Sequence, residues 1–200
     1  MNVPVDEEKR ALREAMRGRR RAVTVEQARE AGAQAARVLA AHFRALTPLL
    51  SDGRVALLYS ALPGEVDTLA LDGFLRRQGL DVAYPRVDGE SLALHLAHPS
   101  ELAPGKFAIA EPSTSARSVA AGALALVVVP GLAFDFAGGR LGFGGGYFDA
   151  LLASAPRALR VGLCFSHQLQ PRVPEAAHDA RMDYLLVADD EALHPTGARR

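Results

Sequence analysis

The strongest constraint on the fold is an uninterrupted run of six apolar residues, 124–129, that leads toward a glycine-rich segment. A run this short, ending in three consecutive valines, predicts a strand that is buried on both faces. Such strands are typical of parallel sheets, whose helices cover both sides. We therefore expect strands and helices to alternate along the chain.

The flanking sequence follows this pattern. Apolar runs predict strands at residues 55–59, 82–84, 159–165 and 184–187, the last strand, while 92–97 alternates as an edge strand would. Helical spacing predicts helices at 6–21, 25–46, 67–78 and 147–152. Thr24 with Gln27 forms a capping box before the second helix, and Asp67 or Thr68 caps the third. Residues 99–118, with three prolines, predict a long surface loop, and residues 1–5 and 191–200 are expected to fray.

Composition limits the class of protein. The 200 residues suit one domain, 1–200, and a hydrophobic fraction of 49% supplies a sizeable core. The 23 basic and 23 acidic residues balance, which argues against a nucleic-acid partner. A single cysteine, Cys164, excludes an internal disulfide. No apolar stretch is long enough to span a membrane and the N-terminus does not resemble a signal peptide, so we expect a cytoplasmic protein without a membrane partner.

The glycine-rich segment, residues 138–146, is the densest functional signal. Six of the 18 glycines fall within these nine residues, between a predicted strand and a predicted helix. Glycines let backbone N–H groups approach an anion, and a following helix start adds a positive dipole. The segment matches neither the dinucleotide-binding glycine motif nor a P-loop. Because Arg140, Tyr147 and Asp149 accompany the glycines, we favour a phosphate-binding loop over a flexible connection.

Acidic residues near this segment have two interpretations. Asp149 lies in the first turn of a predicted helix, where it serves equally well as a partner of the helix dipole or as a ligand of Mg²⁺. Asp179 and Asp183 precede the last predicted strand. Either could be a second metal ligand, or both could belong to a solvated turn.

Three further features are weaker. Lys9 and Arg13, continued by Arg17, form one stripe of a helix, which is usually a solvated face; yet Lys9 is one of only two lysines in the chain. Glu65 follows a predicted buried strand and could bind a ligand rich in hydrogen-bond donors. Cys164 is expected in the core. The six histidines show no metal-binding spacing, and no nucleophilic triad is evident.

Together these segments resemble the 5-formyltetrahydrofolate cyclo-ligase (5,10-methenyltetrahydrofolate synthetase) family. The matching motifs are Lys9-x-x-Leu12-Arg13, residues 58–60 and 65–68, Tyr84-Pro85-Arg86, residues 129–135, residues 140–149, and Val173-Pro174 through His178-Asp179. They span about residues 9–187, and the block from Pro130 to Asp149 is the most specific. The resemblance implies an α/β, Rossmann-like three-layer domain with a mostly parallel sheet and two N-terminal helices packed against it.

The family resemblance also implies the activity. ATP and Mg²⁺ would convert 5-formyltetrahydrofolate, with or without a polyglutamate tail, to 5,10-methenyltetrahydrofolate, releasing ADP and phosphate. The formyl oxygen would take the γ-phosphoryl group, and N10 would then close the ring. Phosphoryl transfer relies on positioning and charge neutralisation, which agrees with the absence of a protein nucleophile. A monomer or weak homo-oligomer is expected.

Residue roles follow from the same resemblance. Those implied for ATP are Lys9, Arg13, Arg140, Leu141, Gly142, Phe143, Gly144, Gly145, Gly146, Tyr147 and Phe148. Those implied for the folate are Tyr59, Glu65, Phe143, Gly144, Gly145, Gly146 and Tyr147. Arg140 and Tyr147 would be catalytic, and Asp149 with Asp179 would hold Mg²⁺.

The glycine segment departs from some relatives. These have a cation at the position of Phe143 or Gly145, a second tyrosine at Phe148 and an arginine at Ala150. Two alternatives therefore stay open: a paralogue that uses the same chemistry on another formylated substrate in cofactor salvage, and a non-catalytic folate- or nucleotide-binding protein. The second is disfavoured because the candidate metal carboxylates and phosphate-binding cations are all present.

Overall fold

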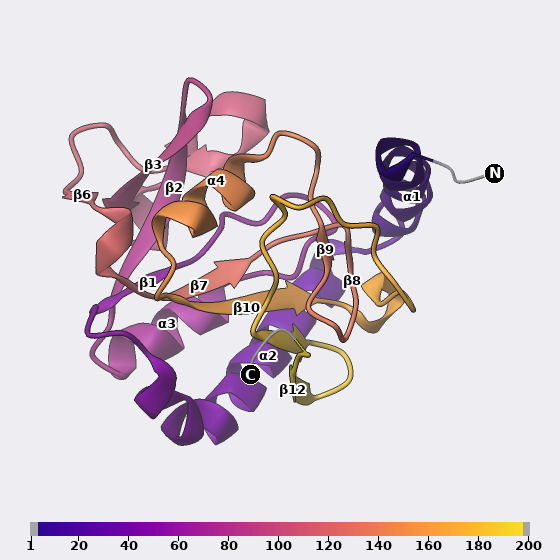
Figure 1. Ribbon diagram of the computed structural model, residues 1–200. Coiled ribbons are helices and arrows are strands. Elements are labelled where there is room, and N and C mark those ends of the chain that lie inside the picture. The colour runs from indigo at the N-terminus through magenta and orange to yellow at the C-terminus, as the bar shows by residue number, and fades with distance from the viewer. Residues whose placement is uncertain (1–3, 198–200) are drawn as a thin grey trace.

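The computed structural model describes residues 4–197, which form a three-layer α/β domain around a mixed sheet (Figure 1). The sheet strands are β1 (Val55–Leu57), β2 (Asp81–Asp88), β3 (Ser91–Leu96), β6 (Ser118–Val119), β7 (Leu124–Val129), β10 (Leu159–Cys164), β11 (Tyr184–Val187) and β12 (Ala192–Pro195). Their order across the sheet is β12-β11-β10-β7-β1-β2-β3-β6.

The centre of this sheet is parallel. Strand β1 pairs in parallel with β2 and β7, and β10 does so with β7 and β11. The edges, β12 on one side and β3 with β6 on the other, are antiparallel. The predicted mostly parallel sheet is therefore confirmed. The order of the parallel strands reverses direction between β1 and β7, which is where ligands bind in open α/β sheets.

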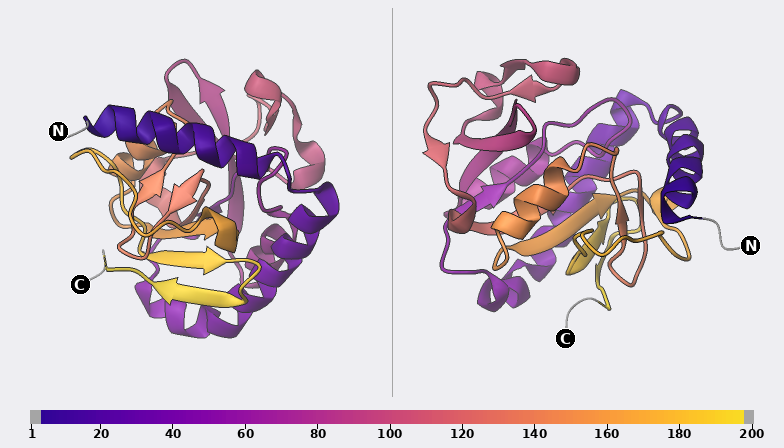
Figure 2. Two further views of the ribbon diagram at one scale, coloured as in Figure 1. Left: turned by 90° about the vertical axis from the view of Figure 1, so that its right-hand side faces the viewer. Right: turned by 45° about the horizontal axis from the view of Figure 1, so that its top comes forward.

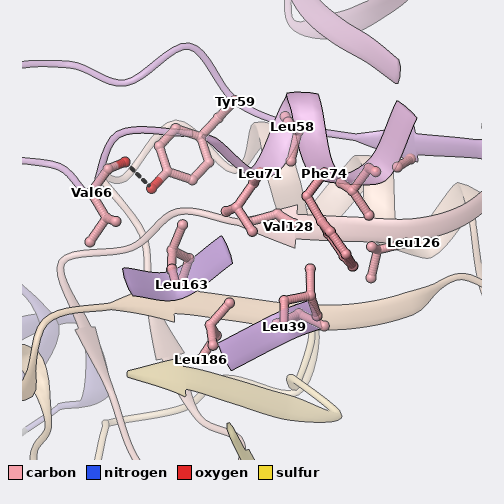
Figure 3. Close-up of a cluster of buried hydrophobic side chains, with 14 of the residues drawn as sticks. Leu39, Leu58, Tyr59, Val66, Leu71, Phe74, Leu126, Val128, Leu163 and Leu186 are labelled. Atoms are coloured by element: carbon pink, nitrogen blue, oxygen red, sulfur yellow. Dashed lines mark hydrogen bonds between the residues drawn. The ribbon is translucent and has the colours of Figure 1, made fainter. Parts of the chain in front are cut away.

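Helices cover both faces because successive residues of each strand point to opposite sides. On β7, Leu126 and Val128 face the layer formed by α2 (Val25–Leu46) and α3 (Leu69–Arg77). Figure 3 shows these two β7 side chains in one cluster with Leu39 of α2 and with Leu71 and Phe74 of α3. Val127 and Val129 face the opposite layer, formed by α4 (Tyr147–Ser154).

The first helix, α1 (Val5–Arg20), has a different place. It lies across the carboxyl ends of the parallel strands, away from the α2 layer (Figure 2). Its buried residue Met16 packs against a small hairpin, β8 (Ala133–Phe134) and β9 (Arg140–Leu141). Of the two N-terminal helices predicted to pack against the domain, α2 thus covers the sheet and α1 covers the loops at its edge.

Several local predictions need correction. Residues 192–195 are not frayed: they form β12, so 184–187 is not the last strand. Val5, also predicted to fray, begins α1. The segment 99–118 contains short strands β4 (Ala103–Pro104), β5 (Ala110–Glu111) and β6 rather than one long loop, because Glu111 is buried and accepts a hydrogen bond from the backbone N–H of Val87. Residues 1–3 and 198–200, also predicted to fray, lie outside the described residues.

The helix starts were mostly predicted correctly. Thr24 and Gln27 form the predicted capping box. At α3, Asp67 accepts a hydrogen bond from the backbone N–H of Leu69. Thr68 does not cap the helix: its hydroxyl donates to the carbonyl of Tyr59. None of the helices in the described part of the chain has the length and apolar character of a membrane span.

Candidate active site

A cleft of about 830 Å³ opens at the carboxyl ends of β1 and β7, where the strand order reverses. Its walls come from α1, the loop after β1, strands β2 and β3, the segment 107–111, the segment from β7 to the start of α4, and the loop before β11. It is lined by all fifteen residues that the sequence predicted for the site: Lys9, Arg13, Tyr59, Glu65, Arg140, Leu141, Gly142, Phe143, Gly144, Gly145, Gly146, Tyr147, Phe148, Asp149 and Asp179. The fold therefore brings the candidate residues together; their individual roles stay predictions.

The glycine-rich segment is divided by the β8–β9 hairpin. Gly138 and Gly139 belong to the hairpin turn, where the N–H of Gly139 donates to Asp135, so they are not part of the predicted anion-binding loop. The loop at the cleft is 142–146. Gly144 and Gly146 have φ angles of +109° and +69°, which side-chain-bearing residues rarely adopt. Within the described residues, the backbone N–H groups of 142–146 donate no hydrogen bond, so they are free to bind an anion.

Two cations of α1, Lys9 and Arg13, line the cleft and are at least partly buried. Lys9 is only 6% exposed and forms an ion pair with Asp179. Arg13 Nε donates to the carbonyl of Gly142 at 3.1 Å, and Arg17 Nη2 donates to the carbonyl of Phe143 at 3.3 Å. For Lys9, the alternative of a solvated helix face is therefore wrong. The helix presents positive charge to the loop that carries the free N–H groups.

Asp149 is held by the segment it follows. It lies in the first turn of α4, as predicted, and its Oδ1 accepts from Arg140 Nη2 at 2.8 Å and from the N–H of Ala180 at 3.2 Å. Arg140 is buried, and its Nη1 donates to the carbonyl of Pro130. Arg140 therefore fixes the carboxylate of Asp149 as well as lining the cleft.

The carboxylates of Asp149 and Asp179 suit a hard cation. Asp179 Oδ2 accepts from Lys9 and from the N–H of Ala176. Burial by itself would raise the pKa of Asp179, but these two donors hold it below its usual range. Residues 4–197 contain no cluster of three or more metal-binding side chains. Carboxylate oxygens are ligands that Mg²⁺ prefers, and this ion usually takes its remaining ligands from phosphate oxygens and water.

The other aspartate considered as a ligand, Asp183, is not in the cleft. Its Oδ2 accepts from the N–H of Arg160 on β10, at 2.9 Å. This contact joins the start of β11 to its neighbour in the sheet. Asp183 therefore supports the strands, and the solvated-turn alternative is also wrong for it.

Glu65 and Tyr59 form the wall after β1. Glu65 is 8% exposed; its Oε2 accepts from the N–H of Leu62 at 2.8 Å. Burial raises the pKa of Glu65, while the nearby Arg20 lowers it. The Tyr59 hydroxyl donates to the carbonyl of Val66 (Figure 3), and burial raises its pKa well above the usual value. Tyr59 is thus a neutral wall residue with its hydroxyl already bonded.

Three residues of this region were not predicted. The hydroxyl of Ser60 is buried and has no hydrogen-bond partner among the described residues, although Ser60 lines the cleft. Phe107 lines the cleft, is 70% exposed and has a φ of +56°. Arg20 contacts the wall after β1 and the glycine segment. No spacing rule marks any of these three residues. Only Ser60 lies in a matching motif, residues 58–60, and nothing in that motif distinguishes its hydroxyl.

The comparisons with known proteins agree with this geometry. A family model described as the 5-formyltetrahydrofolate cyclo-ligase family matches residues 5–188. The chain belongs to the 5-formyltetrahydrofolate cyclo-ligase family. The predicted resemblance is confirmed, and the chain is an enzyme of this ligase family.

Individual members of the cyclo-ligase family match most of the chain. The Escherichia coli K12 5-formyltetrahydrofolate cyclo-ligase is 35% identical over 166 residues, covering 80% of this chain and 88% of the relative. The Mus musculus enzyme is 28% identical over 209 residues, covering 95% and 98%. Among solved structures, the Aquifex aeolicus 5,10-methenyltetrahydrofolate synthetase has a TM-score of 0.77 at 30% identity and covers 96% of this chain and 94% of its own. The predicted fold class is therefore also that of the cyclo-ligase family.

Proposed function

We propose that the enzyme converts 5-formyltetrahydrofolate to 5,10-methenyltetrahydrofolate at the expense of ATP, with Mg²⁺ bound alongside the phosphates. The observation that carries the proposal is the composition of one cleft. The free backbone N–H groups of residues 142–146, the buried cations Lys9 and Arg140, and the carboxylates of Asp149 and Asp179 line one part of it, which we call the phosphate end. Tyr59 and the hydrogen-bond acceptor Glu65 line another part, which we call the folate end. These two sets of groups suit a nucleoside triphosphate and a donor-rich pterin.

The phosphate end would work by positioning. The N–H groups of residues 142–146 would bind phosphate oxygens, and Lys9 with Arg13 would neutralise their charge. Asp149 and Asp179 would hold Mg²⁺, which when bound would neutralise further charge on the transferring group. Arg140 keeps Asp149 in place through its 2.8 Å hydrogen bond. Lys9 and Asp179, already paired, would both contact the bound complex.

The folate end would align the two reacting groups. Glu65 would accept hydrogen bonds from the pterin amino and ring N–H groups, and Phe143 with Tyr147 would border the ring system. The formyl oxygen would attack the γ-phosphorus and ADP would leave. N10 would then attack the activated formyl carbon, phosphate would leave with the oxygen, and the imidazoline ring would close. No step needs a nucleophile from the protein.

The test is incubation with ATP, Mg²⁺ and 5-formyltetrahydrofolate while the absorbance of the methenyl product is followed. We expect the absorbance to rise only when all three are present. ADP release with another formylated amine, but no methenyl product, would favour a salvage paralogue. Tight ligand binding without ADP release would favour a non-catalytic binding protein.

A further inference from the structure

Arg20, the last residue of α1, contacts both the loop after β1 and the glycine-rich segment. Its Nε donates to the carbonyl of Pro63 at 2.8 Å, and its Nη1 lies 3.7 Å from Oε1 of Glu65. Its guanidinium carbon lies 4.9 Å from the centre of the Phe143 ring, within cation–π distance. One side chain therefore connects α1, the loop after β1 and the glycine segment.

The backbone is shaped for this contact. Gly64 has a φ of +83° and packs directly on Arg20: a Cβ at this position would lie 2.4 Å from both Cγ and the carbonyl oxygen of Arg20. A side chain at residue 64 would separate α1 from the loop. The close approach is thus a property of the loop backbone as well as of the arginine.

Glu65 has no other counter-charge within the described residues. Its side chain is 9% exposed, and that of Arg20 is 17% exposed, so solvent screens the pair weakly. The other titratable groups near this pair are acidic: Tyr59 and Asp67 from the loop after β1, and Cys164 from β10. A buried carboxylate without a partner takes up a proton, and a protonated Glu65 would accept fewer hydrogen bonds.

We propose that Arg20 is a positioning residue for the folate: through its ion pair with Glu65 and its contact with Phe143, it holds the acceptor and the aromatic wall in the arrangement that binds the pterin. This inference rests on the proposed function. It assigns to α1 a second task, beside the phosphate contacts proposed for Lys9 and Arg13. Arg20 does not itself contact reacting atoms.

The experiment compares Arg20→Met, which keeps the length of the stem, with Arg20→Lys, which keeps the charge. In Arg20→Met, KM for 5-formyltetrahydrofolate should rise about tenfold or more, with KM for ATP unchanged. Arg20→Lys should recover part of the loss. Arg21→Met is the matched control, because Arg21 is exposed at the same helix end and makes no side-chain hydrogen bond or ion pair among the described residues.

Two further readouts separate positioning from support of the fold. The ratio of the Arg20→Met folate KM to the parental value should increase as the pH falls from 8 to 6, because Glu65 then takes up a proton more readily. In a double-mutant cycle with Glu65→Gln, the Arg20→Met effect on folate KM should largely disappear. Full additivity with Glu65→Gln, or an equal rise of both KM values without pH dependence, would overturn the proposal.

Failure of the proposed function is a separate outcome. If the parent protein forms no methenyl product, the substrate assignment is wrong, whatever the variants do. If the parent is active and Arg20→Met has the folate KM of the parent across this pH range, only the role of Arg20 is wrong.

Discussion

Lys9 and Asp179 form an ion pair between side chains that are 8% and 11% exposed, although 170 residues separate them in sequence. Both residues line the cleft, so the pair joins α1 to the loop before β11 at its wall. In the free enzyme, Lys9 and Asp179 neutralise each other's charge. If the proposed function is right, Lys9 must also bind phosphate and Asp179 must also bind Mg²⁺.

Lys9→Met should therefore affect stability and catalysis separately. Leaving Asp179 buried without its partner should destabilise the fold by about 3–5 kcal/mol, measured by denaturant unfolding. Loss of a charge-assisted phosphate contact should raise KM for ATP about 10- to 100-fold. Adding Asp179→Asn should restore much of the stability but not the ATP affinity. Arg29→Met, at an exposed position of α2 outside the cleft, is the control. An unchanged ATP KM in Lys9→Met would limit Lys9 to a structural role.

Asp149→Asn tests the metal assignment. The amide oxygen can still accept from Arg140 and Ala180, so the melting temperature should change little. The loss of a ligand charge should raise the half-saturating Mg²⁺ concentration on the order of tenfold and lower kcat steeply. Asp52→Asn is the control, because Asp52 is exposed and lies before β1, at the amino-terminal end of a strand whose carboxyl end faces the cleft. A Mg²⁺ titration that overlays the parental curve would remove Asp149 from the metal site.

Two glycines should respond to alanine in opposite ways. Gly18 lies within α1, is exposed, and a Cβ there meets no heavy atom within 4 Å. Gly18→Ala should stabilise the protein by about 0.5–1 kcal/mol and leave activity intact. Gly144→Ala forces alanine to a φ of +109°, which costs about 1–3 kcal/mol or reshapes the loop, so ATP binding should weaken. Thermal melts and ATP KM values check both predictions. An ATP KM for Gly144→Ala equal to that of Gly18→Ala would contradict the anion-binding loop.

Ser60→Ala should weaken binding of the folate and increase the stability of the fold. The buried hydroxyl of Ser60 has no partner among the described residues, and an unsatisfied buried polar group costs about 1–3 kcal/mol. Alanine should therefore raise the melting temperature while it raises KM for the folate. Ser51→Ala provides the opposite case, because the Ser51 hydroxyl donates to the carbonyl of Leu124 and its loss should destabilise. A lower melting temperature for Ser60→Ala would show that the hydroxyl supports the fold.

His167 should make stability sensitive to acid. Its ring stacks on Phe165, and burial, with Arg19 nearby, lowers its pKa below the usual value against the opposing effect of Asp189. The unfolded chain then binds the proton first as the pH falls, so stability should decrease below about pH 6.5. His167→Gln should flatten the melting temperature between pH 7.5 and 5.5. His98→Gln, at an exposed histidine, should keep the parental slope.

The sequence predicted what depends on local patterns. Leu126 and Val127, on opposite faces of one apolar run, specify a strand with helices on both sides, and a parallel sheet places the loops after β1 and β7 at one edge. The strand β12 was missed because its His194 and Pro195 are poor strand signals. Pro195 is tolerated there because β12 is an edge strand that pairs only with β11 among the described strands.

Long-range pairings had no such pattern. Nothing in the sequence separates Arg20 from Arg19 and Arg21, and only the fold sets Arg20 against Glu65. The ion pair between Arg140 and Asp149 could not be predicted either, because an aspartate in the first turn of a helix is already explained by the helix dipole. The motif resemblance identified which residues line the cleft. The pairs that these residues form with one another depend on the folded chain and cannot be seen in the sequence.

The position of α1 has a consequence for biosynthesis. This 16-residue helix is made before the side chains of the cleft that it pairs with, and a helix of that length is only marginally stable alone in water. Translation adds about 5–20 residues per second, so α1 spends seconds without these partners while the parallel strands are still being made. The wall that carries Asp179 is complete only after that residue has left the ribosome. A nascent chain arrested after β10 can thus contain most strands of the sheet and still lack one wall of the cleft.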